Sequence, residues 1–284
     1  MNIKKENDWG GGQGFRFTPY DVHESLYDQD RTNFFARAIQ EVIKEGSVVV
    51  DAGSGSGVLG LLAAKYGASR VYCIEAQERF CNVIARNALA NNLQDRIIVV
   101  NADATTYTLP EKVDVIIAEV ISGGFFFEPQ IQIINNLRSF LNDGGKIIPN
   151  KINTYVEVVS AQEELYGLKF AYDSRCMALE DIVLTEKEIA LESDFYQYVS
   201  PDISLEIILT GTKDAIANAI KVPYSAELTP NVIIQKPTSF LLRPEIIYLP
   251  EKIEIRKGKR YILKMQYRAG SDTLDAKISL SSRD

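Results

Sequence analysis

The stretch VVVDAGSGSG, residues 48–57, determines the fold of this 284-residue chain. Its apolar start belongs to a short strand expected at Ser47–Val50, and a helix with one apolar side begins directly after Gly57. Glycines at such a junction let the backbone turn sharply and approach a ligand where a side chain would collide. A dinucleotide-binding GxGxxG motif would need a third glycine at position 58, which is Val58. The stretch therefore predicts a strand–loop–helix unit with a ligand-binding loop.

Strand and helix patterns continue to alternate after this loop. Short apolar runs predict strands, and apolar residues at helical spacing predict the helices between them. Such alternation predicts a parallel sheet covered on both faces, which is a Rossmann-like domain. The strands are expected at Val71–Ile74, Ile97–Val100, Val113–Ala118 and Gly145–Ile148, and the helices at Tyr20–Glu45, 58–66, Glu78–Asn91 and Pro129–Leu141.

After Pro149 the pattern becomes that of β-structure, with two-residue alternation in several segments. A more charged and more helical segment, roughly 163–200, interrupts it. We expect a mobile or helical cofactor lid at 1–30, a Rossmann-like domain at 31–148, and a β-barrel-like substrate domain at 149–284 with an arm near 163–200. Its strands are expected at Thr154–Val159, Ser204–Leu209, Lys252–Arg256, Arg260–Arg268 and Thr273–Leu280, with hairpin turns at 257–259 and 269–272.

Composition excludes several classes of protein. The formal net charge of −7 argues against a general nucleic-acid binder and fits a cationic substrate. A net charge of this size is also what keeps an ordinary protein soluble. The three cysteines form no CxxC pair, no N-terminal apolar segment is present, and no run is long enough to cross a membrane. We therefore expect a reducing cytoplasm and no membrane partner. A single histidine, His23, makes metal chemistry unexpected.

Acidic residues follow the next two strands. Glu75 ends the strand after the glycine loop, where a carboxylate can accept both ribose hydroxyls of a nucleoside. Asp103, with Ala104, follows the next strand and is placed to reach an adenine edge. A tight glycine turn and a solvated strand end would explain either feature alone. Together they predict a nucleoside cofactor.

A second loop, AEVISGGFFFE at residues 118–128, leaves the carboxyl end of the strand Val113–Ala118. Open α/β sheets bind ligands at that edge. Glu119 and Glu128 bracket a glycine turn, so the loop could bring both carboxylates to one point. Three consecutive phenylalanines, ending at Phe127, could form an apolar wall around them. Taken alone, two loop glutamates would more often be solvated surface charges.

Several segments resemble the protein arginine methyltransferase family. Residues 48–76 (VVVDAGSGSGVLGLLAAKYGASRVYCIEA) and 22–32 (VHESLYDQDRT) are similar to its cofactor-binding runs, and the 118–128 loop is similar to its double-glutamate loop. The resemblance implies S-adenosylmethionine as cofactor, a guanidino substrate and a homodimer formed through the arm. It implies that Arg31 binds the cofactor's methionine carboxylate with His23 beside it. The remaining implied residues are Asp51, Gly53, Gly55, Gly57 and Ala76 for the cofactor, and Tyr20, Phe127, Thr238, Ser239 and Phe240 for the substrate.

Paired carboxylates suit a guanidinium acceptor. A guanidinium has a pKa above about 12, so it arrives charged and is a poor nucleophile. Its repulsion from a sulfonium about 5 Å away costs on the order of 3 kcal/mol at an effective dielectric near 20. Glu119 and Glu128 could offset both charges, and either could receive the proton that the attacking nitrogen loses.

One motif departs from the family pattern. The family usually carries Thr-His-Trp in its barrel, whereas the best match here is Thr238-Ser239-Phe240. Serine cannot carry a proton near neutral pH. The change leaves open a small-molecule N- or O-methyltransferase with a reshaped pocket. It also leaves open a catalytically silent binding module on the same fold.

Overall fold

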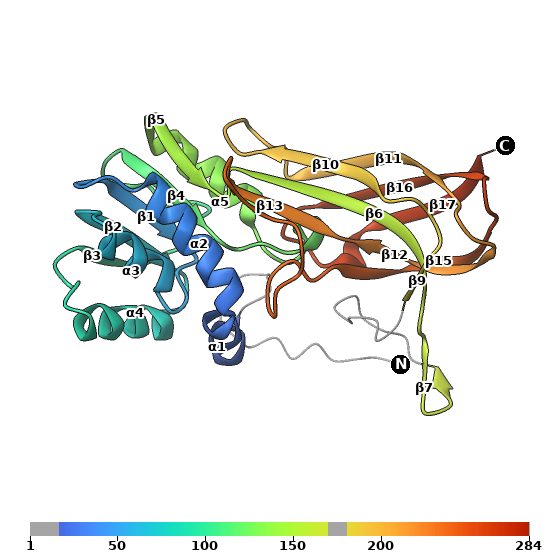
Figure 1. The fold of residues 1–284 in the computed structure, drawn as a ribbon, viewed down its shortest axis with the longest axis horizontal. Coiled ribbons are helices and arrows are strands. Elements are labelled where there is room, and N and C mark those ends of the chain that lie inside the picture. Colours follow the sequence, from blue (N-terminus) through green and yellow to red (C-terminus); the bar gives the residue numbers. More distant parts are fainter. Residues whose placement is uncertain (1–16, 170–180, 284) are drawn as a thin grey trace.

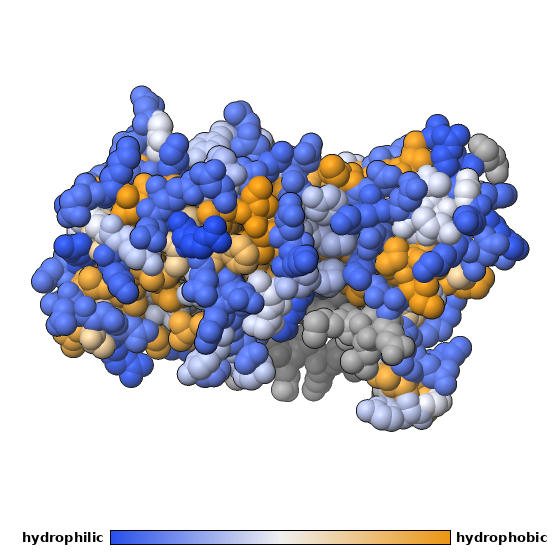
Figure 2. All heavy atoms as spheres, viewed as in Figure 1, coloured by the Kyte–Doolittle hydropathy of each residue, from blue (hydrophilic) through white to orange (hydrophobic). Residues whose placement is uncertain are grey.

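The computed structural model describes residues 17–169 and 181–283, which form two halves side by side (Figure 1). One half holds a parallel sheet and its helices, and the other is built almost entirely of antiparallel strands. One continuous apolar core runs through both halves. Apolar side chains appear in patches among hydrophilic ones on the face drawn in Figure 2. No helix in the described ranges is long and apolar enough to cross a membrane.

The first half is the predicted Rossmann-like domain, so that prediction is confirmed. Its five strands are all parallel, in the order β3-β2-β1-β4-β5. The order reverses between β1 and β4, which places a ligand crevice at the carboxyl ends of these two strands. The elements are β1 (Val48–Ala52), β2 (Arg70–Glu75), β3 (Ile97–Asn101), β4 (Val113–Ala118), β5 (Leu141–Ile148), α3 (Val58–Lys65), α4 (Glu78–Ala90) and α5 (Gln130–Leu137).

Two helices, rather than one, precede the sheet. α1 (Pro19–Tyr27) begins at a capping box in which Thr18 and Asp21 bond to each other's backbone N–H groups. α2 (Gln29–Val42) begins at Asp28, whose carboxylate accepts a hydrogen bond from the Arg31 N–H at 3.0 Å. The single helix expected at Tyr20–Glu45 is therefore wrong, because an N-capping aspartate starts a second helix in its middle.

The second half is antiparallel, as expected of the β-rich region. Its largest sheet has the path β14-β13-β6-β12-β15, with β9 and β10 also pairing with β6, and a three-stranded sheet has the order β11-β16-β17. The long strand β6 is central to this half. The elements are β6 (Lys151–Ala161), β7 (Glu164–Leu165), β8 (Leu168–Lys169), β9 (Asp181–Val183), β10 (Glu188–Asp194), β11 (Asp202–Thr210), β12 (Ala215–Val222), β13 (Tyr224–Thr229), β14 (Val232–Ile234), β15 (Glu245–Ile255), β16 (Arg260–Arg268) and β17 (Lys277–Arg283).

Three expectations for this half are wrong. The segment 163–200 is not helical where it is described: β7 and β8 form a small hairpin, and β9 and β10 pair with β6. Residues 170–180 of that arm lie outside the described residues. The turn at 257–259 joins two different sheets, because β15 pairs with β12 whereas β16 pairs with β11. The strand expected at Thr273–Leu280 begins instead with a 3₁₀ turn at Thr273–Asp275.

Candidate active site

A deep cavity opens at the carboxyl ends of β1, β2 and β4, where the reversed strand order predicts a ligand. The walls come from the glycine loop, the ends of β2 and β3, the N-terminal helices, and the loop after β4. Most of the residues expected to bind the cofactor line it: Arg31, Asp51, Gly53, Gly55, Glu75, Ala76, Asp103 and Ala104. The cavity therefore brings together the glycine loop and the carboxylates at the ends of two strands, as the sequence predicts for a nucleoside site.

The glycine loop has no room for side chains. Gly53 has φ +72°, and a Cβ built on it would lie 2.4 Å from the Val120 side chain. Gly57 has φ +80°, and its Cβ would lie 3.1 Å from Ile84. Gly57 does not line the cavity; it ends the loop and starts α3. Its left-handed conformation allows the turn into the first residues of the helix.

We expect Gly53→Ala to weaken cofactor binding at least about 10-fold and to lower the free energy of unfolding by about 1–3 kcal/mol, because it adds both φ strain and a collision with Val120. Gly144→Ala is the matched control, since Gly144 has φ +75° and no atom within 4 Å of its built Cβ. The control should show only the backbone strain. Calorimetry with S-adenosylhomocysteine and urea unfolding measure the two effects. If Gly53→Ala bound the cofactor as tightly as the wild-type protein, the proposed role of the glycine loop in cofactor binding would be contradicted.

Glu75 is held in place at the end of β2. Its two carboxylate oxygens accept hydrogen bonds from the N–H groups of Gly55, at 3.0 Å, and Gln77, at 2.8 Å. It is buried and lines the cavity. Asp103, at the end of β3, is fixed by hydrogen bonds from the backbone and hydroxyl of Thr105. Both carboxylates are therefore oriented before any ligand arrives.

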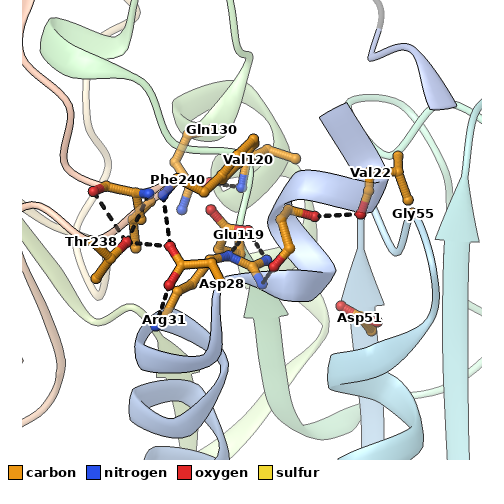
Figure 3. A network of polar contacts seen from close by, with 12 residues as sticks. Val22, Asp28, Arg31, Asp51, Gly55, Glu119, Val120, Gln130, Thr238 and Phe240 are labelled. Carbon is orange, nitrogen blue, oxygen red and sulfur yellow. Dashed lines mark hydrogen bonds and ion pairs between the residues drawn. The ribbon is translucent and has the colours of Figure 1, made fainter. Parts of the chain in front are cut away.

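Arg31 and Glu119, which both line this cavity, form a buried ion pair (Figure 3). The Arg31 Nε donates to Glu119 at 2.9 Å, a second guanidinium nitrogen pairs with the same carboxylate, and a third donates to the Ser25 carbonyl at 3.1 Å. Their side chains are 5% and 7% exposed. Burial raises the pKa of Glu119, and the charge of Arg31 opposes that shift. Sequence spacing gives no sign of this pair, since its members lie 88 residues apart.

Asp51 is a second buried acid of the cavity whose pKa is raised. Burial raises its pKa to about 7, although the Gly60 N–H donates to its carboxylate at 3.0 Å. The residue therefore holds a proton over part of the physiological range. A shifted carboxyl group in a cleft is typical of functional sites.

Stability should consequently depend on pH through Asp51. The folded protein keeps this proton up to about pH 7, whereas the unfolded chain releases it near 3.8, so the free energy of unfolding should fall as pH rises between these values. The expected fall is a few kcal/mol, because a tenfold change in a protonation equilibrium corresponds to about 1.4 kcal/mol. Asp51→Asn should flatten the curve measured by urea unfolding between pH 5 and 8. An unchanged slope in that variant would contradict the assignment to Asp51.

The double-glutamate loop is anchored in the β-rich half. Phe125 and Phe126 are fully buried, and the Phe126 ring stacks on Tyr267 at 4.2 Å. The Tyr267 hydroxyl donates to the Gly124 carbonyl at 2.8 Å, and the Phe127 N–H donates to the Ser271 carbonyl at 2.8 Å. The expectation that the three phenylalanines form an apolar wall around the glutamates is thus wrong. They fasten the loop to the β-rich half, and none of them lines this cavity or the second cavity beside it.

A second cavity, which we call the acceptor cavity, lies next to the first. Phe17, Glu128 and Phe240 line both, so Glu128 stands where the two meet. The acceptor cavity is completed by Asp21, Ile121, Ser122, Tyr224, Arg243, Pro244 and Glu245. Burial raises the pKa of Tyr224 well above its ordinary value, and the negative charge of Glu128 adds to that shift. Glu119 lines only the cofactor cavity, so the two glutamates are not equivalent.

Asp28 links the N-terminal helices to the β-rich half (Figure 3). Its carboxylate accepts hydrogen bonds from the Thr238 hydroxyl and from the Phe240 N–H at 2.8 Å, besides the Arg31 N–H. Burial raises the pKa of Asp28, but these hydrogen bonds outweigh that effect and lower its pKa overall. The Thr-Ser-Phe segment therefore docks on α2 through its threonine and its backbone, with no contribution from a histidine.

Some expected site residues lie elsewhere. His23 is exposed, its ring lies 4.3 Å from that of Tyr27, and it does not line the cofactor cavity. Tyr20 is 68% exposed and lines neither cavity. Thr238 and Ser239 line a third cavity, which shares Arg243 and Pro244 with the acceptor cavity. Conversely, sequence reasoning missed Tyr224, Arg243 and Glu245, which no motif marks. No group of three or more His, Cys, Asp or Glu side chains in the described part of the chain could hold a metal ion.

Comparisons with known proteins agree with this geometry. The family model described as ribosomal protein L11 methyltransferase (PrmA) matches residues 30–170. The chain is 32% identical over 257 residues to Uncharacterized protein MJ1452 of Methanocaldococcus jannaschii, covering 90% of this chain and 94% of that protein. It is 34% identical over 143 residues to protein arginine N-methyltransferase 6 of Danio rerio, covering 49% of this chain and 41% of that protein.

Two further likenesses point the same way. Probable protein arginine N-methyltransferase 6.2 of Oryza sativa subsp. japonica is 30% identical over 213 residues, covering 64% of this chain and 52% of that protein. The solved structure titled Trypanosoma brucei PRMT1 enzyme-prozyme heterotetrameric complex with AdoHcy has a TM-score of 0.75 at 22% identity and covers 93% of both chains. The matched region spans about half the length, or less, of the Danio rerio and Oryza sativa arginine methyltransferases.

The fold and the cavity at the β1–β4 crevice define a class I methyltransferase, for which S-adenosylmethionine is the methyl donor. The chain belongs to the same family as the Methanocaldococcus jannaschii protein, and its resemblance to the protein arginine methyltransferases is confirmed.

Proposed function

We propose that the protein transfers a methyl group from S-adenosylmethionine to a guanidino nitrogen. The observation that carries this proposal is the position of Glu128, a buried carboxylate at the junction of the cofactor cavity and the acceptor cavity. Bound there, the cofactor supplies an electrophilic methyl group on a sulfonium. A cationic acceptor can approach that group only if negative charge offsets the repulsion.

Each buried charge then has a distinct role. Glu128 orients the guanidinium and accepts the proton that the attacking nitrogen loses as its bond to the methyl carbon forms. Arg31 holds Glu119 in place and offers its remaining donors to the methionine carboxylate of the cofactor. Glu75 receives the ribose hydroxyls in the proposed complex. These roles use positioning and charge, which suffice for an activated donor.

The position of Glu128 favours this function over its alternatives. A hydroxyl or neutral amine acceptor brings no positive charge for the buried Glu128 carboxylate to offset, and burying that carboxylate costs free energy. A silent binding module would have no need for a second cavity that meets the first at a carboxylate. The test is a screen of guanidino, amino and hydroxyl acceptors by release of S-adenosylhomocysteine. Turnover only with amino or hydroxyl acceptors would overturn the guanidino assignment.

We also propose a homodimer and a cytoplasmic location. The β7–β8 hairpin supports the dimer, because Tyr166 at its tip is 94% exposed and Leu168 is 61% exposed. Apolar side chains that are this exposed are often buried against a second protein. The reduced, buried thiols of Cys73 and Cys81 support a reducing compartment.

A further inference from the structure

The acceptor cavity carries charges of both signs. Glu128 lines both this cavity and the cofactor cavity, Asp21 and Glu245 add two further carboxylates, and Arg243 adds a cation. Within residues 17–169 and 181–283, Arg243 forms no ion pair, although eight other arginines and lysines do. A cavity built only to attract a cationic side chain would have no use for an arginine in its wall.

The backbone that carries Arg243 is fixed beside the cavity. The Leu242 N–H donates to the Tyr224 hydroxyl at 3.1 Å, and the Leu241 N–H donates to the Thr238 hydroxyl at 2.9 Å. Leu242 itself has φ +61°, a conformation that costs free energy for a branched side chain. The chain is therefore held at one geometry immediately before Arg243.

Glu245 is brought to the same place by close backbone packing. A Cβ built on Gly123 would lie 3.0 Å from the Glu245 side chain and 3.2 Å from its backbone nitrogen. The start of β15 thus rests on the double-glutamate loop. Beside it, the Ser122 hydroxyl is buried, has no hydrogen-bond partner among the described residues, and belongs to a residue that lines this cavity. An orphaned hydroxyl there indicates a polar ligand.

We propose that the acceptor is a free guanidino amino acid, with L-arginine as the simplest example; this inference rests on the proposed function. Such a molecule presents a guanidinium, an ammonium and a carboxylate. Glu128 matches the guanidinium, Glu245 matches the ammonium, and Arg243 matches the carboxylate in a bidentate pair. An arginine inside a peptide chain carries neither terminal charge, so it could make neither of the last two contacts.

Three acceptors separate these contributions: L-arginine, agmatine, which lacks the carboxylate, and N-acetyl-arginine amide, which lacks both terminal charges. With the wild-type protein and saturating S-adenosylmethionine, KM should be lowest for L-arginine, by about 10-fold or more over the other two, since charged hydrogen bonds are lost with each. The intrinsic reactivity of the guanidinium is the same in all three, so kcat should differ less.

Variants then assign the carboxylate contact. Arg243→Ala should raise KM for L-arginine about 10- to 100-fold and leave KM for agmatine within about twofold, because agmatine has nothing to pair with Arg243. Arg243→Lys should recover part of the loss. Lys236→Ala is the matched control, since Lys236 is an exposed cation of the same segment that lines none of the cavities described above. It should change neither KM.

Two outcomes would overturn the inference while leaving the proposed function intact. One is turnover of N-acetyl-arginine amide with a KM equal to that of L-arginine. The other is an equal rise of KM for L-arginine and agmatine in Arg243→Ala. Methylation of arginine-containing peptides but of none of the three small acceptors would likewise overturn only this inference. Methylation of amino or hydroxyl acceptors and of no guanidino acceptor would reject the proposed function itself.

Discussion

Replacing Glu128 with glutamine should lower turnover about 100-fold or more and leave affinity for S-adenosylhomocysteine within about twofold. Glutamine keeps the size and most of the hydrogen bonding, so the loss measures the negative charge at the junction of the two cavities. S-adenosylmethionine should bind more weakly than to the wild-type protein, because only its sulfonium is positive. Single-turnover rates and calorimetry with both nucleosides measure these effects.

Glu251→Gln is the control for Glu128→Gln. It removes the same charge from an exposed position on β15 that lines neither cavity. Its turnover should match that of the wild-type protein. Glu128→Gln with a methylation rate within about twofold of wild type would show that Glu128 is an ordinary structural carboxylate.

Arg31→Leu should lower the free energy of unfolding by about 3–5 kcal/mol, because it leaves the buried Glu119 carboxylate without its counter-charge. The same change should weaken cofactor binding at least about 10-fold, since the proposed partner of the methionine carboxylate is gone. Protonation of Glu119, whose pKa burial already raises, would recover part of the lost stability at low pH.

The double variant Arg31→Leu with Glu119→Leu separates stability from function. Replacing both members of a buried pair by apolar side chains is often neutral or stabilising, so urea unfolding should return close to the wild-type value. Cofactor binding and turnover should stay low. Recovery of both stability and cofactor affinity in the double variant would show that Arg31 only neutralises Glu119.

Much of the cofactor site could be predicted from the sequence because it is local. The glycine loop, Glu75 and Asp103 each lie at the end of a strand or within two residues of it, and parallel strands bring their carboxyl ends to one edge. Glu128 was identified for the same reason, since its loop leaves β4. The strand β12, whose four central residues are buried, was missed because those residues do not alternate between apolar and polar.

The acceptor cavity could not be predicted in the same way. Arg243 lies two residues before β15 and Glu245 begins that strand, more than a hundred residues after Glu128 in the printed sequence, and nothing in their local pattern marks them. The triple phenylalanine was misread for a related reason. Its partner, Tyr267, belongs to a distant strand, and only the fold shows that the rings fasten the loop.

Guanidino methylation is tested most directly by identifying the atom that receives the methyl group. The protein would be incubated with L-arginine and S-adenosylmethionine labelled with ¹³C in its methyl group, and the product would be analysed by NMR. We expect a labelled carbon bonded to a guanidino nitrogen, with one S-adenosylhomocysteine formed for each methyl group transferred. A label found on an α-amino nitrogen or on a carboxyl oxygen would contradict the proposed function.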